Sequence, residues 1–244
     1  MLINIVLHEV RPRVKLIVMA NRKTKFFIGE YYHIYNRGVE KRDIFNDNND
    51  CDRFLKLLFL CNSRKSVHIV DMFRKNLSLY DILEFNRGDT LVDIIAYCLM
   101  PNHFHLVIKE RIEGGISKFI QKLSTGYTMY FNERNDRSGA LFQGAFKSEH
   151  INNDAYFNYI FVYICLNPLS IIEPGFKNKG ISDKERAKSF IKKYKYSSYI
   201  DYVGTGRKES VLINKDCVPN FLKDMRHFDE FIDGLEAYTR SDLV

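Results

Sequence analysis

Two apolar runs joined by a Pro-Asn turn constrain the fold of this chain more than any other feature. The runs cover residues 91–100 and 103–110, and runs of this length joined by a short turn predict a β-hairpin. Residues two apart on a strand share a face, so His103 and His105 can approach one ion. The alternate residues on the other face are apolar: Phe104, Leu106 and Ile108. The hairpin therefore predicts one core-facing and one polar face.

The segments on either side of the hairpin predict the rest of the sheet. Aromatic and β-branched residues at 26–36 predict a first strand, and 49–62 predicts a helix with candidate N-caps at 47–50. The remaining expected elements are an amphipathic helix at 116–134, a fourth strand or partly irregular extended segment at 140–151, and a helix at 154–167. The order β-α-β-β-α-β, followed by one more helix, predicts an α+β fold with a ferredoxin-like antiparallel sheet.

Three segments lie outside this pattern, and they divide the chain around a domain at 26–170. Residues 1–25 form a basic arm or an upstream extension, since Met19 is an alternative start. Residues 63–90 are an elaboration, with a possible strand at 67–73 and a short helix at 78–85. Residues 171–244 form an extension, expected to be helical, that is basic at 177–195 and acidic after about residue 220.

Charge and cysteine usage restrict the class of protein. The net charge of +7 favours a polyanionic partner, nucleic acid before membrane. In the basic segment, lysines are interleaved with Tyr194, Tyr196, Tyr199 and Tyr202, which suits a nucleic-acid contact. The five cysteines are widely spaced and include no CxxC pair, which indicates a reducing cytoplasm. Neither a signal peptide nor an apolar run long enough to span a membrane is predicted.

The last predicted helix carries a second pair of candidate functional residues. His-x-His alone is a weak sign of a metal site, because such pairs occur by chance. Tyr163 and Asn167 are spaced i, i+4 and share a helical face. An asparagine oxygen can complete a divalent-metal shell begun by two imidazoles. A tyrosine one turn away can attack a phosphate that such a metal orients. Buried tyrosines and helix-ending Asn-Pro pairs are common, so spacing alone leaves a structural role open.

Four segments taken together resemble the HUH single-tyrosine transposases, most closely the REP-associated tyrosine transposases. The segments are YHIYNRGVEKRDIF (32–45), AYCLMPNHFHLVI (96–108), STGYTMYFNERNDRSGALFQGAFKS (124–148) and YIFVYICLNPL (159–169). The resemblance implies that Tyr163 is the nucleophile and that His103, His105 and Asn167 bind Mg²⁺ or Mn²⁺. It implies cleavage of single-stranded DNA at a hairpin, leaving a 5′-phosphotyrosine and a free 3′-hydroxyl.

Other tyrosines and polar residues compete for these roles. Tyr159, one turn before Tyr163, is the main rival nucleophile, and Tyr156 is another candidate. Tyr127 and Tyr130 are interpreted as core or strand-contact residues. Gln143, Lys147 and His150 are candidates for the phosphate or the metal shell, although each alone is better explained as structural or exposed. The residues expected to contact the DNA are Arg37, Lys41, Arg42, Gln143 and Lys147.

Three functions are consistent with the sequence. The first is a transposase-type DNA strand transferase, acting as a monomer or a homodimer; in some relatives the tyrosine helix is exchanged between subunits. The second is a domesticated relative that binds hairpin DNA or RNA without cutting it. The third is a basic globular domain with incidental histidines, which would place Tyr163 far from His103.

Overall fold

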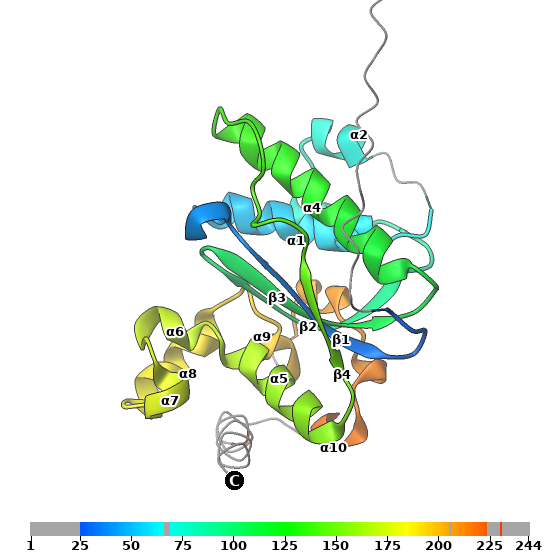
Figure 1. The fold of residues 1–244 in the computed structure, drawn as a ribbon. Coiled ribbons are helices and arrows are strands. Elements are labelled where there is room, and N and C mark those ends of the chain that lie inside the picture. The colour runs from blue at the N-terminus through cyan, green and yellow to red at the C-terminus, as the bar shows by residue number, and fades with distance from the viewer. Residues whose placement is uncertain (1–24, 66–68, 205, 224–229, 231–244) are drawn as a thin grey trace, which may run out of the picture.

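One antiparallel sheet organises the computed structural model, which describes residues 25–65, 69–204, 206–223 and 230. Among the described residues the sheet has four strands in the order β2-β3-β1-β4 (Figure 1). The strands are β1 (Tyr31–Arg37), β2 (Val92–Met100), β3 (His103–Glu110) and β4 (Lys147–Ile151). This order, with helices between the strands, confirms the expected α+β ferredoxin-like fold. The predicted N-terminal arm, up to residue 24, and most of the acidic C-terminal end lie outside the described residues.

Two helices cover one face of the sheet and a third covers the other (Figure 1). Helices α1 (Asn48–Cys61) and α4 (Gly115–Arg134) enclose the main core, and α5 (Asp154–Leu166) crosses the opposite face. The rings of Phe54, Phe104 and Tyr127 pack together in the main core, and all three are fully buried. The apolar alternate residues of β3 point into this core as predicted, so His103 and His105 lie on the α5 face.

Side-chain caps fix where α1 and α5 begin. Asp47 accepts a hydrogen bond from the backbone N–H of Asp50 at the start of α1, and Asn153 accepts one from Tyr156 at the start of α5. Such caps satisfy backbone donors that have no partner inside the helix. The cap at Asn153 sets the helical phase of α5, and with it the direction in which Tyr163 points.

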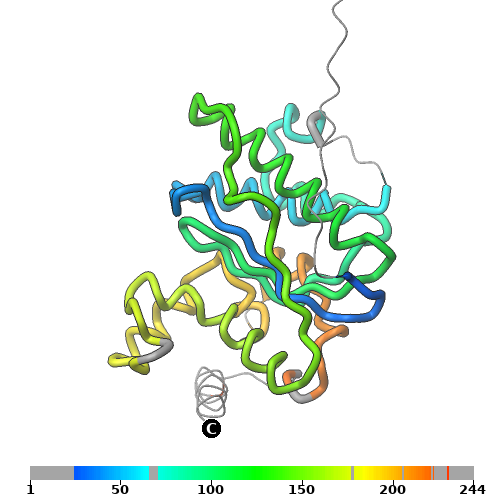
Figure 2. The backbone as a smooth tube through the Cα atoms, in the orientation of Figure 1, coloured from blue at the N-terminus to red at the C-terminus, as the bar shows by residue number. Residues whose placement is uncertain are grey.

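The C-terminal extension runs along the free edge of β2 (Figure 2). The Leu99 N–H donates to the Tyr196 carbonyl, Ser198 N–H to the Tyr97 carbonyl, and Asn214 N–H to the Ile94 carbonyl. Covering the edge in this way removes a template for unwanted strand pairing. The described part of the extension contains short helices: α6 (Leu169–Ile172), α7 (Phe176–Lys179), α8 (Lys184–Lys193), α9 (Tyr199–Tyr202), η2 (Lys208–Leu212), η3 (Lys215–Cys217) and α10 (Asn220–Lys223).

The tyrosines of this extension are structural, which corrects their expected role as a nucleic-acid contact. Tyr199 is fully buried, Tyr196 and Tyr202 are nearly so, and the Tyr194 hydroxyl donates to the Leu99 carbonyl. Their rings fasten the extension to β2. Lys192 and Lys193 are exposed at the end of α8, whereas Lys195, between Tyr194 and Tyr196, lies with its Nζ 4.9 Å from the centroid of the Tyr196 ring.

The expected strand at 67–73 is wrong for its described part, because residues 69–74 form helix α2 (Ile69–Arg74). A short apolar run cannot be assigned to strand or helix by periodicity alone. Here Met72 and Phe73 pack against the core, with the Arg53 guanidinium 3.2 Å above the Phe73 ring. The short helix is present as α3 (Leu79–Leu83), which begins with a Ser78–Asp81 capping box.

The segment expected as a fourth strand is regular only at its end. Residues 147–151 pair with β1, while 140–146 follow the second alternative and are irregular. Two backbone hydrogen bonds hold the irregular part: Val39 N–H to the Leu141 carbonyl and Gln143 N–H to the Arg37 carbonyl. The loop therefore lies against the end of β1.

Asn62 joins the two ends of the 63–90 elaboration, and its removal should destabilise the fold. Its buried side chain accepts from Leu91 and Val92 N–H and donates to the Val92 carbonyl. Asn62→Ala removes these side-chain bonds to buried backbone, although the Leu91 N–H keeps its bond to the Asn62 carbonyl, so we expect a loss of about 1–3 kcal/mol in the free energy of unfolding. Urea denaturation measures this loss, and an unchanged midpoint would show that water replaces the side chain.

Candidate functional site

The two histidines of β3 lie on the α5 face of the sheet. The rings of His103 and His105 are 5.0 Å apart between centroids. In the register with β1, His105 pairs with Tyr35 and His103 with Arg37. His105 is buried and His103 is half-buried. The pair therefore stands where β3 enters the sheet, with one imidazole inside and the other near the rim.

Both imidazoles are oriented through Nδ1. His103 Nδ1 lies 2.6 Å from Asn102 Oδ1, and His105 Nδ1 lies 2.8 Å from His33 Nε2. Metal-ligating histidines commonly donate one ring N–H to a neighbour and bind the metal with the other nitrogen. The two side chains thus fit a metal bound through Nε2.

Tyr163 reaches His105 from α5 within the same chain. The two rings meet edge to face, with centroids 5.5 Å apart. Burial raises the pKa of the Tyr163 phenol, while a side-chain hydrogen bond with Asn167 lowers it. The phenol is therefore neutral near pH 7.

Asn167 ends α5 one turn after Tyr163, and its side chain is buried. Its Nδ2 atom has no partner at full hydrogen-bonding distance among the described residues, so the contact with Tyr163 is a loose one. A donor held in this way can stabilise a developing phenolate. The sequence did not predict this contact between the Asn167 amide and Tyr163. The role of Asn167 as a third metal ligand stays a prediction.

The other tyrosines considered as nucleophiles or core residues lie at different positions relative to the histidines. The Tyr159 ring lies 5.9 Å from that of Tyr163. The Tyr156 hydroxyl donates to Glu149 at 2.7 Å. Tyr127 lies fully buried in the main core and Tyr130 bonds Asp50, as expected for core residues. Of these, Tyr163 is the one whose ring contacts His105.

His33 and Glu149 belong to the same cluster, and sequence reasoning missed both. His33 on β1 is buried beside His105, and Glu149 on β4 pairs with His33 in the sheet. The alternation of β1 could have indicated His33, because Tyr32 and Ile34 face the core and His33 must face the other way. Glu149 could not be found without the register of β4.

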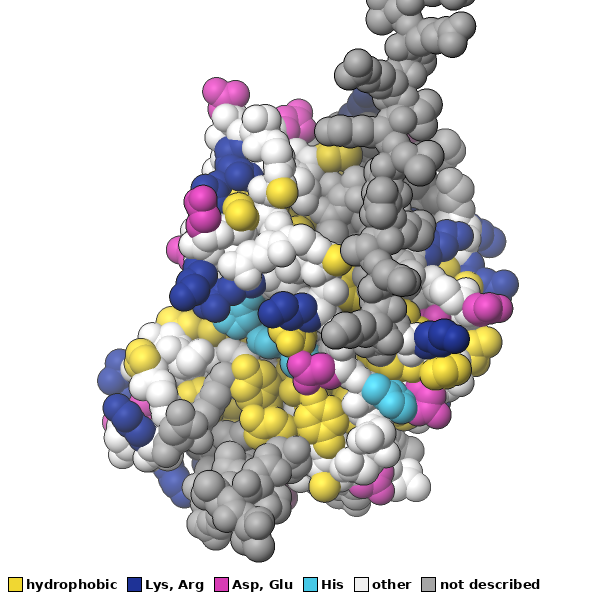
Figure 3. Space-filling model, in the orientation of Figure 1, with side chains coloured by type: hydrophobic (Ala, Val, Ile, Leu, Met, Phe, Trp, Pro, Cys, Tyr) yellow, Lys and Arg dark blue, Asp and Glu magenta, His cyan; other side chains and the backbone are white. Residues whose placement is uncertain are grey.

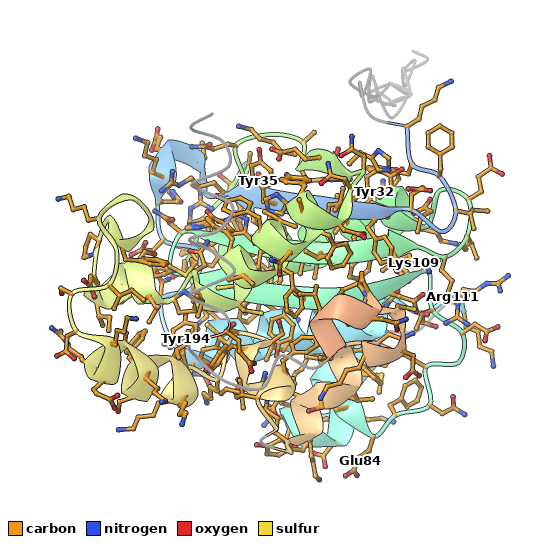
Figure 4. The ribbon with its side chains drawn as sticks, turned by 90° about the horizontal axis from the view of Figure 1, so that it is seen from below. Tyr32, Tyr35, Glu84, Lys109, Arg111 and Tyr194 are labelled. Atoms are coloured by element: carbon orange, nitrogen blue, oxygen red, sulfur yellow. The ribbon has the colours of Figure 1, made fainter. Side chains whose placement is uncertain are left out.

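The residues expected to contact DNA gather around the histidines. Arg37 ends β1, Lys41 lies in η1 (Val39–Lys41), Lys147 begins β4, and Gln143 lies in the preceding loop. The space-filling view shows histidines in the middle of this face, with Lys and Arg on one side and an apolar patch on the other (Figure 3). Viewed from below, Tyr35 and Lys109 mark opposite ends of the sheet (Figure 4).

The turn that carries Lys41 and Arg42 depends on a close backbone approach. An added Cβ at Gly38 would lie 2.3 Å from the Arg42 carbonyl oxygen, so no other residue fits without a shift. Asn102 fastens this turn to the site, since its Nδ2 donates to the Lys41 carbonyl while its Oδ1 contacts His103. By contrast, His150 is outside the cluster and pairs with Glu30 at 3.0 Å.

Comparison with known proteins gives one family and one structural neighbour of note. The sequence model described as "Transposase IS200 like" matches residues 27–166, more than half of the chain. No curated protein matches significantly. A solved structure described as the REP-associated tyrosine transposase bound to a REP hairpin has a TM-score of 0.47 and 11% identity, covering 78% of this chain and 93% of its own.

Two features are absent from the described residues. No group of three or more His, Cys, Asp or Glu side chains is placed to hold a metal ion. None of the helices in the described part of the chain is both long and apolar enough to cross a membrane.

Proposed function

The chain belongs to the IS200-like transposases, and from this premise we propose that it cleaves and rejoins single-stranded DNA beside hairpins, with Tyr163 as the nucleophile. The observation that carries the proposal is the contact between the Tyr163 and His105 rings, 5.5 Å apart, from elements 58 positions apart in the sequence. Because one chain assembles this cluster, the proposed site needs no exchanged helix.

The proposed reaction is a transesterification at phosphorus. The Tyr163 oxygen attacks the scissile phosphate, a bond forms between that oxygen and phosphorus, and the bond to the 3′-oxygen of the preceding nucleotide breaks. The phenol proton passes to solvent and the leaving oxygen takes up a proton, which gives a 5′-phosphotyrosine and a 3′-hydroxyl. Attack by a 3′-hydroxyl on the phosphotyrosine reverses these changes and joins strands without an energy source.

The residues present fit a divalent cation, Mg²⁺ or Mn²⁺, held by His103 and His105 with the Asn167 oxygen as third ligand. When bound, such an ion withdraws charge from a phosphate oxygen and orients the scissile bond. Two imidazoles and one amide bring no negative charge, so the phosphate and water must complete the shell. The chain's own part is to orient the imidazoles through Asn102 and His33 and to hold the phenol beside them.

A hairpin oligonucleotide with a single-stranded flank tests the proposal. After incubation with Mn²⁺, denaturing electrophoresis should show labelled DNA attached to the protein, and EDTA should prevent attachment. Binding of the hairpin without attachment under any metal condition would instead support the domesticated, non-cleaving alternative for DNA or RNA.

The basic residues around the histidines are proposed to contact the phosphate backbone. We expect Arg37→Ala with Lys147→Ala to weaken binding to all single-stranded sequences alike, because backbone contacts set affinity more than sequence choice. The slope of log K against log salt should fall by about 0.7 for each phosphate that the variant no longer neutralises. Fluorescence anisotropy at several salt concentrations measures the slope.

Lys118→Ala is the matched control for this experiment. Lys118 is an exposed lysine of α4, on the layer opposite the proposed site. Its removal takes away one positive charge but should leave the slope unchanged. The double variant loses two positive charges and the control loses one, so an equal change in slope per charge removed would mean that net charge, and not the proposed contact, explains the effect.

A further inference from the structure

Glu149, His33 and His105 form a line of polar groups that ends at a proposed metal ligand. His33 Nε2 lies 2.8 Å from His105 Nδ1, and His33 Nδ1 lies 3.9 Å from Glu149 Oε2. The three residues come from three neighbouring strands, β4, β1 and β3, and point to the same face. We propose that His33 and Glu149 are positioning residues that present the His105 Nε2 lone pair to a divalent cation. This inference rests on the proposed function.

The hydrogen-bonding requirements of imidazole link the three groups. His105 can bind a cation through Nε2 only if its proton is on Nδ1, where it is donated to His33 Nε2. A neutral His33 that accepts at Nε2 must carry its own proton on Nδ1, which faces Glu149. The opposite set of tautomers would place a proton on His105 Nε2 and block the metal. A carboxylate beside His33 Nδ1 favours the first set, because a carboxylate accepts but does not donate.

Burial makes this preference strong. His33 and His105 are 5% and 6% exposed, so water gives little competition. Among the described residues, His33 Nδ1 is buried and has no partner at hydrogen-bonding distance. At 3.9 Å, the Glu149 carboxylate oxygen lies just beyond that range. A buried N–H gains most from a partner, so a short approach of Glu149 would complete the line.

Glu149 is held in place from two other elements. Its carboxylate accepts hydrogen bonds from the Tyr35 hydroxyl at 2.8 Å and from the Tyr156 hydroxyl at 2.7 Å. His33, with these two hydroxyls, lowers the pKa of Glu149 to about 2, so the group is ionised at neutral pH. Since Tyr156 lies on α5, the same carboxylate fastens the helix of the proposed nucleophile to the sheet that carries the proposed metal ligands.

We call the line Glu149–His33–His105 the relay. Glu149→Gln and His33→Phe test it in the full-length protein without DNA. Isothermal titration with Mn²⁺ should show a Kd about 10-fold higher for Glu149→Gln, and about 10- to 100-fold higher for His33→Phe, the range found for groups behind a ligand. NMR of isotope-labelled imidazole nitrogens in metal-free protein should show His105 protonated on Nδ1 in the wild type. Glu149→Gln should shift part of the population to Nε2.

The control is Glu30→Gln, which alters a second carboxylate–histidine pair, between Glu30, just before β1, and His150 on β4. It should leave Mn²⁺ affinity and the His105 spectrum unchanged. If Glu149→Gln behaves like Glu30→Gln in both measurements, the relay is overturned. If the wild type binds no Mn²⁺, the metal site of the proposed function is overturned. If Glu149→Gln leaves the His105 tautomer unchanged, the relay is overturned.

Discussion

Tyr163→Phe is expected to abolish covalent attachment of the protein to single-stranded DNA while leaving binding intact. The substitution removes the attacking oxygen and keeps the ring, which packs edge to face on His105. Loss of an activated nucleophile lowers turnover by a factor of roughly 10³ or more. Denaturing electrophoresis with a labelled oligonucleotide measures attachment, and anisotropy measures binding.

Tyr159→Phe is the matched control, since it removes a hydroxyl from the same helix one turn earlier. Its ring lies 5.9 Å from Tyr163, and we expect at most a small change in rate. Persistence of the adduct in Tyr163→Phe and its loss in Tyr159→Phe would transfer the role of nucleophile to Tyr159. An adduct that survives both substitutions would exclude both residues. Tyr127 needs no such test as a nucleophile, because it is buried on the other side of the sheet.

The periodicity of the chain predicted the sheet and the two faces of the strand that carries His103 and His105. A pair of histidines two apart and a tyrosine four residues before an asparagine are local patterns, and strand and helix geometry convert them directly into shared faces. The strand order follows from the sequence of elements, because few connections are sterically allowed. Those patterns alone left a structural role for Tyr163 open, and the resemblance to a known family joined it to His105; the structure places their rings in contact.

The same periodicity could not reveal the relay behind His105. His33 and Glu149 are 72 and 44 positions from His105, and only the register of β1 with both neighbours brings them together. That register depends on the irregular segment 140–146, whose length no pattern fixes. The wrong prediction of a strand at 67–73 has a related cause, since periodicity does not assign a short apolar run whose half-buried Met72 and Phe73 pack against the core.

Replacing both histidines should reduce cleavage to the level that the wild type shows in EDTA. In His103→Ala with His105→Ala, the proposed metal loses two ligands, and we expect cleavage in Mn²⁺ to fall by at least about 10²-fold, because a bound cation supplies several kcal/mol of charge stabilisation. Adding EDTA to this variant should cause no further loss. Removing the metal and removing its two ligands would then have the same effect on cleavage. Rates of adduct formation, measured with and without EDTA for both proteins, give the comparison.

The informative contradiction is a wild type that EDTA does not slow and a double variant that is inactive. The histidines would then act directly on the substrate, as proton-transfer groups or hydrogen-bond donors, and not through a cation. The single variants separate these cases further. His103 is half-buried and bonded to Asn102, whereas His105 is buried between His33 and Tyr163. A cation needs both ligands and predicts similar losses from either substitution, whereas direct proton transfer to the substrate predicts that one histidine accounts for nearly all of the effect.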